Sequence, residues 1–395
     1  MNSGVNPGLS LRVAPLRIAL VTSSYNFIAD GVALTLNRLV AYLESQGVQV
    51  LVFAPVARQA AFAHQGTLVP VPSIPLPGRP EYRLAFGLAG AAKRRLLDFA
   101  PDIIHLAVPD LLGQAALALA QRHHIPAVAS YHTRYETYLK HYWYLAPLEG
   151  WLKRILREFY GRCREVYVPS PSVREELLAD GLTDNFKPWP RGIDTQRFTP
   201  DKRSPAWRTG YGIGADELVI LHVSRLVREK RLDTLTKALQ AISVPHRVVI
   251  VGDGPDRDYV QRELPGAVFT GFLDGEALAT AYASSDIFVF PSDSESFGNV
   301  TLEAMASGLP TVCADATGSR SLVAPGETGF LALADDAEGF ARHITTLAQD
   351  GPLRRRMGQS ARKRSLDFSW EETLARMLGY YRALLAGTPD VKITP

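Results

Sequence analysis

Short apolar segments alternate with helical segments along this chain, and the alternation limits its possible folds more than any single motif does. In the first half, the apolar segments Leu16–Thr22, Val48–Pro55 and Asp102–Val108 are separated by segments with helical spacing, such as Val32–Gln46. Continuous apolar strands between helices are typical of a parallel sheet that helices cover on both faces. The pattern therefore predicts an α/β fold of the doubly wound class.

The alternation starts again after Lys187–Gly192, a segment that contains two prolines. Leu218–Ser224 and Val248–Gly252 are again short and apolar. A chain of 395 residues is long for one hydrophobic core and usually divides into two domains. We therefore expect two Rossmann-like domains, over residues 16–190 and 191–370, with a ligand cleft between them beyond the carboxyl ends of the strands.

The end of the chain predicts one more helix, over residues 371–387. Apolar side chains recur there at helical spacing: Trp370, Leu374, Met377, Leu378 and Tyr381. By contrast, the proline-rich segment Val69–Pro80 predicts a connecting loop.

Composition narrows the class of protein. Hydrophobic residues make up 46% of the chain, and its apolar runs are shorter than the roughly 20 residues that span a bilayer. The two cysteines, Cys163 and Cys313, argue against a disulfide framework or a cysteine metal site and fit a reducing cytoplasm. Residues 1–190 carry 19 Lys and Arg against 14 Asp and Glu, which favours an anionic partner. Because no nucleic-acid motif occurs, an anionic membrane surface is the better candidate.

Two carboxylates flank the turn that follows the apolar segment Ile287–Phe290. Glu295 lies in the turn and Glu303 about two helical turns later, with Phe297–Asn299 between them. The start of a helix offers unpaired backbone N–H groups and a positive dipole end, which suit a pyrophosphate or a sugar hydroxyl. Two carboxylates at this separation can bind the two ends of a sugar nucleotide. The alternative is a surface loop followed by an ordinary amphipathic helix.

Two cations follow the first apolar segment of the second half. Arg225 lies at the end of that segment and Lys230 five residues later, where both can flank a leaving diphosphate. Charge-assisted hydrogen bonds to phosphate are strong, and they matter most while negative charge develops on the departing group. The alternative is a solvated basic start of a helix, and Arg228 and Arg231 are predicted to be surface residues of that kind.

A glycine turn, Gly252 to Gly254, closes another apolar segment, and glycine lets the backbone approach a ligand closely. Such turns are common, so this signal is weak on its own. The nearby Asp256 and Asp258 have the spacing of some metal sites. They follow a proline at the start of a predicted helix, where acidic side chains interact with the helix dipole, so we predict no metal site.

The segment His141–Arg164 combines aromatic, apolar and basic side chains. Positions 148, 151, 152, 155 and 159 form one apolar face of a helix, and Lys153, Arg154 and Arg157 lie on its polar side. Basic amphipathic helices with interfacial aromatic residues bind membrane surfaces. The segment therefore predicts membrane contact; the alternative is that its apolar face packs on the core of the first domain.

Four sequence strings together resemble the retaining glycosyltransferases of family 4, which have the GT-B fold. In the family's order they are Ser130–Thr133, Arg191–Asp194, Ser224–Lys230 and Glu295–Gly308. The surroundings of His132 are most similar to the branch with GDP-mannose-dependent α-mannosyltransferases and sulfoquinovosyl-diacylglycerol synthases, which act on lipid acceptors. The resemblance covers residues 16–370 and implies that the terminal helix crosses back to the first domain.

The resemblance also implies roles for the matching residues. The implied catalytic residues are His132, Arg225, Lys230 and Glu295. The implied donor-binding residues are Gly31, Gly252, Gly254, Phe297, Gly298, Asn299 and Glu303. Candidates for contact with the acceptor are Asp30, Tyr135, Tyr138 and Arg191. Asp30 stands where the family has glycine, so we expect that loop to differ in shape.

The sequence therefore predicts a hexosyltransferase that moves a mannose- or glucose-type sugar from a nucleotide-diphosphate sugar to a membrane lipid or glycolipid. We expect it to work without a cofactor or an essential metal, in the cytoplasm and peripherally on the inner face of the cell membrane. A soluble or polysaccharide-precursor acceptor is one alternative. A sugar-nucleotide epimerase shares the fold but would lack this spacing of glutamates. An inactive binding module would lack Arg225, Lys230 or Glu303, and all three are present.

Overall fold

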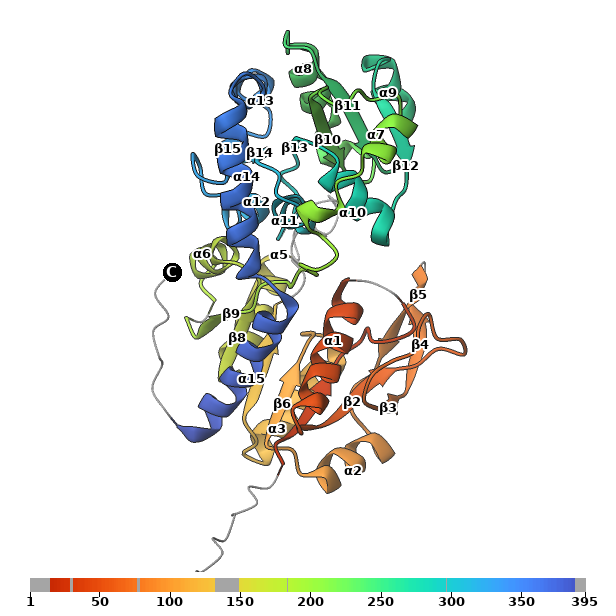
Figure 1. Ribbon diagram of the computed structural model, residues 1–395. Helices are drawn as coiled ribbons and strands as arrows, with labels where there is room; N and C mark the ends of the chain where they lie inside the picture. Colours follow the sequence, from red (N-terminus) through yellow and green to blue (C-terminus); the bar gives the residue numbers. More distant parts are fainter. Residues whose placement is uncertain are drawn as a thin grey trace, which may run out of the picture. The chain divides into compact units, whose positions relative to one another are not determined.

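The chain forms two compact units in the computed structural model, which describes residues 15–28, 31–76, 79–131, 149–182, 184–295 and 297–387. The first unit comprises Met1–His132, Gly150–Val166 and Tyr381–Pro395. The second unit comprises Thr133–Glu149 and Tyr167–Tyr380. Two large sheets with helices around them make up most of the described residues (Figure 1).

The first sheet has seven strands in the order β3-β2-β1-β6-β7-β8-β9. The strands are β1 (Arg17–Val21), β2 (Gln49–Pro55), β3 (Thr67–Val71), β6 (Ile103–Leu106), β7 (Ala127–Ser130), β8 (Glu165–Val168) and β9 (Phe186–Pro188). The helices along this stretch are α1 (Gly31–Ser45), α2 (Gly90–Phe99), α3 (Leu111–Arg122), α5 (Glu149–Gly161) and α6 (Pro171–Ala179). The pairs from β3 through β7 are parallel, as the alternation of strands and helices predicts.

The second sheet has six strands in the order β12-β11-β10-β13-β14-β15, and all five pairs are parallel. The strands are β10 (Val219–Val223), β11 (Arg247–Val251), β12 (Val268–Gly271), β13 (Ile287–Phe290), β14 (Thr311–Ala314) and β15 (Gly329–Ala332). The α-helices are α7 (Pro205–Gly210), α8 (Leu232–Gln240), α9 (Arg257–Glu263), α10 (Gly275–Ala283), α11 (Asn299–Ala306), α12 (Thr317–Arg320), α13 (Ala337–Gln349), α14 (Gly351–Leu366) and α15 (Trp370–Ala386). Two short 3₁₀ helices are η2 (Pro200–Lys202) and η3 (Arg228–Lys230).

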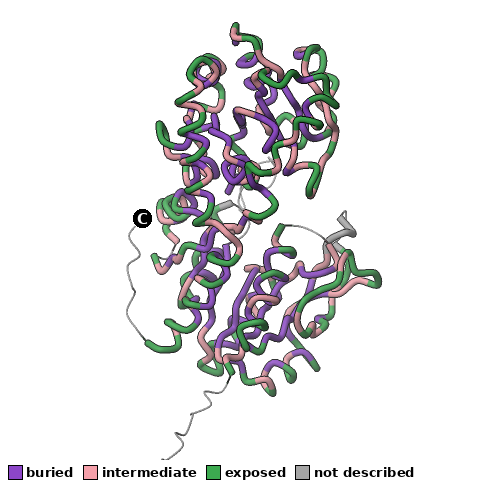
Figure 2. Tube along the Cα trace, in the orientation of Figure 1, coloured by how far each residue is buried: buried purple, intermediate pink, exposed green. Residues whose placement is uncertain are grey.

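Each strand of the second sheet sends alternate side chains into two separate cores. In β10, Val219 and Leu221 belong to one core cluster, whereas Ile220 belongs to the other. In β13, Phe288 and Ile287 divide in the same way. Because successive side chains of a strand point to opposite faces, a strand buried on both faces must be apolar throughout. Figure 2 shows these central strands as buried.

Polar side chains fix the starts of several helices. Asp110 accepts a hydrogen bond from a backbone N–H of α3, and Ser170 does the same for α6. Asp336 and Asp350 cap α13 and α14 in this way. A side-chain cap satisfies one of the backbone N–H groups that a helix start leaves without a partner.

The prediction of a loop over Val69–Pro80 is wrong, because this segment contributes to three strands. β3 pairs with β2 at the edge of the first sheet, and β4 (Ser73–Leu76) pairs with β5 (Arg79–Ala85) as an antiparallel hairpin. Proline lacks the N–H that a central strand needs, but an edge strand tolerates it. Pro70 lies in the edge strand β3, so the prolines indicated an edge rather than a loop.

The prediction of a continuous apolar face on the helix over residues 148–159 is only partly correct. The side chain of Phe159 is 1% exposed, and Leu156 and Tyr160 are buried beside it in α5. Trp151, at the start of the same helix, is 63% exposed. The second half of α5 therefore packs on the core of the first unit, as the alternative reading held.

The predicted terminal helix is present as α15. Leu374, Met377, Leu378 and Tyr381 are all buried, as their spacing predicts. The hydroxyl of Tyr381 lies 2.6 Å from Nδ1 of the buried His105, and both residues belong to the first unit. The last turns of α15 therefore pack in the same unit as β6.

No helix in the described segments combines the length and the apolar character that crossing a bilayer requires.

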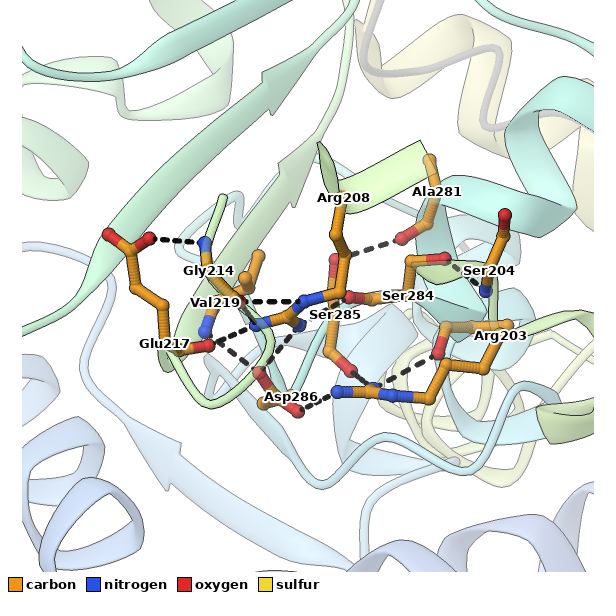
Figure 3. Close-up of polar contacts among 11 residues, drawn as sticks. Arg203, Ser204, Arg208, Gly214, Glu217, Val219, Ala281, Ser284, Ser285 and Asp286 are labelled. Atoms are coloured by element: carbon orange, nitrogen blue, oxygen red, sulfur yellow. Dashed lines mark hydrogen bonds and ion pairs between the residues drawn. The ribbon is translucent and has the colours of Figure 1, made fainter. Parts of the chain in front are cut away.

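The buried Arg208 connects the amino ends of β10 and β13. Arg208 is 3% exposed and donates to the backbone carbonyls of Ser284 and Gly214, each at 2.9 Å (Figure 3). It also lies 3.3 Å from the carboxylate of Asp286, which accepts from the backbone N–H of Val219 at 2.9 Å. The guanidinium thus satisfies acceptors from two distant segments at once, residues 214–217 and 284–286.

Arg208→Ala is expected to destabilise the second unit by about 3–5 kcal/mol, because it leaves the carbonyls of Ser284, Gly214 and Glu217 without this donor and removes one of the two arginines that pair with Asp286. Urea unfolding followed by fluorescence measures the change. Arg203→Ala is the matched control: Arg203 pairs with the same Asp286 at 2.9 Å, but its side chain is 44% exposed. Loss of such an exposed pair is expected to cost less than about 1 kcal/mol. Equal losses in the two variants would contradict a special role for Arg208.

Candidate functional site

Three predicted site segments meet at one edge of the second sheet. Strands β11, β10 and β13 are neighbours and parallel, so their carboxyl ends lie side by side. The segments that follow these ends are Gly252–Gly254, Ser224–Arg225 and Pro291–Glu295. Ligands of open parallel sheets bind beyond this edge. The structure therefore brings together residues that lie up to 70 positions apart.

The glycines of the turn after β11 let the backbone of the chain itself approach closely. A Cβ atom at Gly252 would lie 1.9 Å from the carbonyl oxygen of Ser224, and one at Gly254 would lie 2.3 Å from that of Leu226. The N–H of Leu226 also donates to the carbonyl of Asp253 at 2.9 Å. The turn thus holds the segment around Arg225 in place, and the direct role of these glycines in donor binding stays a prediction.

Both predicted cations have carboxylate partners at this edge. Lys230 forms an ion pair with Glu295, and its ammonium group lies 3.4 Å from the hydroxyl of Ser294. The side chains of Lys230 and Glu295 are 16% and 32% exposed. Arg225 is far more exposed, and its guanidinium lies 3.4 Å from Glu229. The cation at position 230 and the carboxylate at position 295, which were predicted separately, are therefore in direct contact.

The side chain of Glu303 is more buried than its predicted role in donor binding implies. It is on α11, and its carboxylate accepts a hydrogen bond from the hydroxyl of the buried Tyr282 at 3.0 Å. Burial raises the pKa of Glu303 to about 7, and the hydrogen bond from Tyr282 offsets part of this rise. At neutral pH this side chain is therefore divided between its charged and neutral forms.

The three residues between the glutamates differ in their surroundings. The ring of Phe297 is 3% exposed and lies 6.1 Å from the ring of Phe368, so the side chain belongs to the core. Gly298 has φ of 91° directly before α11, a conformation that favours glycine. Asn299 begins the helix and is exposed. Backbone groups, rather than the Phe297 side chain, are thus the groups that a ligand can reach here.

Sequence reasoning missed Gly318, which lies beneath this loop. A Cβ atom at Gly318 would lie 2.9 Å from the carbonyl oxygen of Glu295 and 3.0 Å from its Cβ. The close approach of α12 to the loop therefore depends on glycine. The sequence gives no signal for it, because the two residues are brought together only by the fold.

Sequence reasoning also missed a buried histidine behind Arg225. His222 lies in β10, with Nδ1 3.0 Å from the carbonyl of Val289 and Nε2 2.8 Å from the hydroxyl of Ser224. Burial lowers the pKa of His222 to about 4, so the ring is neutral at pH 7. A carbonyl can only accept, so Nδ1 carries the proton and Nε2 accepts from Ser224. One polar residue within an otherwise apolar strand was the available signal.

The remaining predicted residues belong to other segments of the chain. Gly31 begins α1 in the first unit. Arg191 follows β9 in the second unit and is partly buried. Four predicted residues lie outside the described residues: Asp30, His132, Tyr135 and Tyr138.

The strand that leads to His132 is nevertheless well defined. Ser130, the last residue of β7, is hydrogen-bonded to Nε2 of His105, whose other ring nitrogen contacts Tyr381. Burial lowers the pKa of His105 to about 3, so this ring is neutral as well.

Comparisons with known proteins identify the family. Residues 29–197 match the model of "Glycosyltransferase Family 4", and residues 204–364 match that of "Glycosyl transferases group 1". A GDP-mannose-dependent alpha-mannosyltransferase of Corynebacterium glutamicum is 33% identical over 97% of this chain and 92% of its own length. The chain belongs to glycosyltransferase family 4. It is an enzyme of the hexosyltransferase type, as its sequence predicts.

Two further relatives are similar to this glycosyltransferase over most of its length. A GDP-mannose-dependent alpha-mannosyltransferase of Mycobacterium tuberculosis is 34% identical over 93% of this chain and 97% of its own length. A sulfoquinovosyl transferase of Arabidopsis thaliana is 32% identical over 92% of this chain and 72% of its own length.

Solved structures of glycosyltransferases confirm the predicted GT-B fold. Sucrose-phosphate synthase from Thermosynechococcus elongatus has a TM-score of 0.73 at 23% identity and covers 94% of this chain and 100% of its own. An Anabaena enzyme in complex with UDP has a TM-score of 0.71 at 19% identity and covers 93% and 100%. At these identities the likeness shows the fold alone.

The affinity of this glycosyltransferase for a sugar nucleotide is expected to fall about tenfold between pH 8 and pH 6. Only the charged form of Glu303 can accept two hydrogen bonds from ribose hydroxyls, and its pKa of about 7 makes that form scarce at pH 6. Calorimetric titration with GDP-mannose, whose diphosphate does not titrate in this range, measures the change. In Glu303→Gln the affinity is expected to be lower and independent of pH; an unchanged pH dependence would contradict the assignment to Glu303.

The thermal stability of Glu303→Gln provides a second test of the raised pKa of Glu303. The native pKa of Glu303 is raised above the ordinary 4.5, so the folded state loses stability as pH rises from about 4.5 to 7. Glu303→Gln is therefore expected to have a higher Tm than wild type at pH 8 and the same Tm at pH 5.

Proposed function

We propose that this protein transfers a hexose, with mannose from GDP-mannose as the first candidate, to a lipid or glycolipid acceptor at a membrane surface. Both mannosyltransferases described above carry GDP-mannose in their names, and other relatives are alpha-monoglucosyldiacylglycerol synthases. The observation that carries the proposal is the contact of Lys230 with Glu295 at the carboxyl edge of the second sheet. A cation and an acid side by side suit a ligand with both phosphate and hydroxyl groups.

In the proposed reaction, the donor diphosphate replaces Glu295 as the partner of Lys230 and also contacts Arg225. Glu295 is then free to accept hydrogen bonds from hydroxyls of the hexose, together with the backbone of Phe297–Asn299. Glu303 accepts from the ribose. The two cations stabilise the negative charge that develops on the leaving diphosphate, which is the step where fixed donors accelerate a reaction most.

The proposed roles of residues between positions 30 and 191 rest on resemblance alone. His132 would line the donor sugar and Gly31 would approach the phosphates, whereas Asp30, Tyr135, Tyr138 and Arg191 are candidates for acceptor contacts. We propose retention of configuration at the anomeric carbon, with a β-phosphate oxygen of the donor taking the proton of the acceptor hydroxyl. Water must be excluded for transfer to compete with hydrolysis.

We also propose that no metal is needed. Asp256 and Asp258 lie at the start of α9, where acidic side chains interact with the helix dipole. Arg225 and Lys230 supply two positive charges for the diphosphate from the protein itself.

The proposal is tested with the purified enzyme and a panel of GDP- and UDP-hexoses, by release of the nucleoside diphosphate with and without extracted lipid. Arg225→Ala and Lys230→Ala are each expected to lower kcat about 10²–10³-fold, because each removes one donor to the charge of the transition state. The affinity for the nucleoside monophosphate is expected to stay within about threefold.

Chelation with EDTA is the second arm of this experiment, and activity is expected to persist. Near wild-type turnover in either cation variant would contradict the diphosphate role. Loss of activity in EDTA with rescue by Mg²⁺ or Mn²⁺ would contradict the metal-free mechanism. Conversion of the donor to an epimer without transfer would favour an epimerase.

Membrane contact is a further part of the proposal, carried by the start of α5. Trp151 is 63% exposed, and Arg154 and Arg157 on the same helix are exposed as well. An aromatic side chain among cations is typical of helices that bind the interface of an anionic membrane. The buried Phe159 anchors the other end of this helix in the unit.

The triple variant Lys153→Ala/Arg154→Ala/Arg157→Ala is expected to bind anionic vesicles about two powers of ten more weakly at low salt, at roughly 1 kcal/mol for each charge. Co-sedimentation with vesicles of phosphatidylglycerol and phosphatidylcholine measures it.

A matched control removes three exposed arginines of the second unit, as Arg342→Ala/Arg355→Ala/Arg356→Ala. An equal loss in both triple variants would show a response to net charge rather than a membrane-binding helix. Binding that ignores lipid charge would favour a soluble acceptor.

A further inference from the structure

Two loops of the second unit are joined by adjacent ion pairs. In the loop after β10, Lys230 and Arg231 are consecutive; in the loop after β13, their partners Glu295 and Asp293 are two residues apart. Nε and Nη2 of Arg231 both donate to Oδ2 of Asp293, at 3.2 Å and 2.5 Å. Lys230 contacts Glu295 directly beside them. The pair that the proposed reaction uses therefore has a second pair as its neighbour.

A serine between the two acidic residues completes the row. The hydroxyl of Ser294 donates to the backbone carbonyl of Glu229 at 3.3 Å and lies 3.4 Å from the ammonium group of Lys230. Residues 293, 294 and 295 of one loop thus contact the consecutive positions 229, 230 and 231 of the other. The two loops are held in one register.

The backbone of Arg231 has a conformation that arginine rarely adopts. Its φ of 54° and ψ of 46° lie in the left-handed region, between the end of η3 and the start of α8. A Cβ atom disfavours this region, and glycine adopts it without cost. Non-glycine residues in such conformations cluster at functional sites.

Stability alone does not explain arginine at this position. The side chains of Arg231 and Asp293 are 42% and 35% exposed, and exposed ion pairs contribute little to folding. Glycine would suit the backbone better. What arginine adds is a rigid fork of two N–H groups on one carboxylate oxygen, which fixes the loop after β13 relative to the chain at position 231.

We infer that Arg231 and Asp293 form a positioning pair, which sets the separation of Lys230 and Glu295 when the donor arrives. The inference rests on the proposed function, since it assigns the pair to the same diphosphate and hexose site. When the diphosphate takes over Lys230, the contact between Lys230 and Glu295 is lost. The Arg231–Asp293 pair then remains and keeps the two loops together.

Arg231→Gly tests this role because glycine fits the left-handed backbone but has no guanidinium. The variant is expected to keep its Tm within about 2 °C of wild type. Its kcat is expected to fall about tenfold or more, since small displacements of catalytic groups cost large factors in rate. Its KM for the donor is expected to change less than kcat. Arg231→Lys, which keeps the charge without the fork, is expected to recover only part of the rate.

A double-mutant cycle tests the pairing itself. Asp293→Asn is expected to lower kcat as much as Arg231→Gly does, and the double variant to be no slower than either single variant. Lys202→Ala is the control, because Lys202 forms an ion pair with Glu276 at 2.7 Å with a similarly exposed side chain of 37%. Its kcat is expected to equal that of wild type.

Hydrogen exchange separates failure of this inference from failure of the proposed function. Amides of Asp293–Glu295 are expected to exchange about tenfold faster in Arg231→Gly than in wild type, whatever the reaction is. Faster exchange in a protein with no transferase activity would keep the pairing and overturn the proposed function. Unchanged exchange, unchanged kcat, or additive effects in the cycle would overturn the positioning pair.

Discussion

Burial of both faces of the central strands is the constraint on which the second unit depends. Strands β10, β11 and β13 are apolar apart from the neutral His222 and from Arg247 at the amino end of β11, because their apolar side chains point into one of two cores. Charged groups can therefore be placed only where the strands end. The parallel arrangement brings three of these ends together, and the loops that follow carry the charges. The alternation of apolar strands with polar loops thus determines both the two cores and the position of the candidate site.

Three cations at this edge are each paired with a carboxylate of the chain itself. Arg225 has Glu229, Lys230 has Glu295, and Arg231 has Asp293. Without these partners, three adjacent positive charges would repel one another and disfavour the native loop. An anionic ligand that displaces one of these carboxylates therefore replaces one ion pair with another. Much of the conformational entropy that the cationic side chains would lose on binding the ligand is thus already lost during folding.

The sequence was sufficient to predict the alternation of strands and helices, the GT-B fold, and the position of the cations, Glu295 and the glycine turn after neighbouring strands of the second unit; the roles of these residues stay predictions. These features depend on local patterns, such as apolar periodicity and residues that follow a strand end. It was not sufficient for contacts between distant segments. Arg208 was not predicted, because its acceptors on Gly214 and Ser284 are backbone atoms that no motif marks. Arg231 looked like a surface residue for the same reason, since its partner lies 62 residues away. The prolines of Val69–Pro80 were misread because an edge strand and a loop tolerate them equally.

Each of the two large sheets has a buried histidine in one of its inner strands. His105 in β6 and His222 in β10 each contact a serine near the carboxyl end of a strand, Ser130 and Ser224. Burial keeps both rings neutral, with pKa values of about 3 and about 4, so these contacts do not change between pH 6 and pH 8. Glu303 behaves differently, because its pKa is raised to about 7. A change in donor binding within this pH range is therefore not to be assigned to either buried histidine, and its loss in Glu303→Gln would assign it to the glutamate on α11.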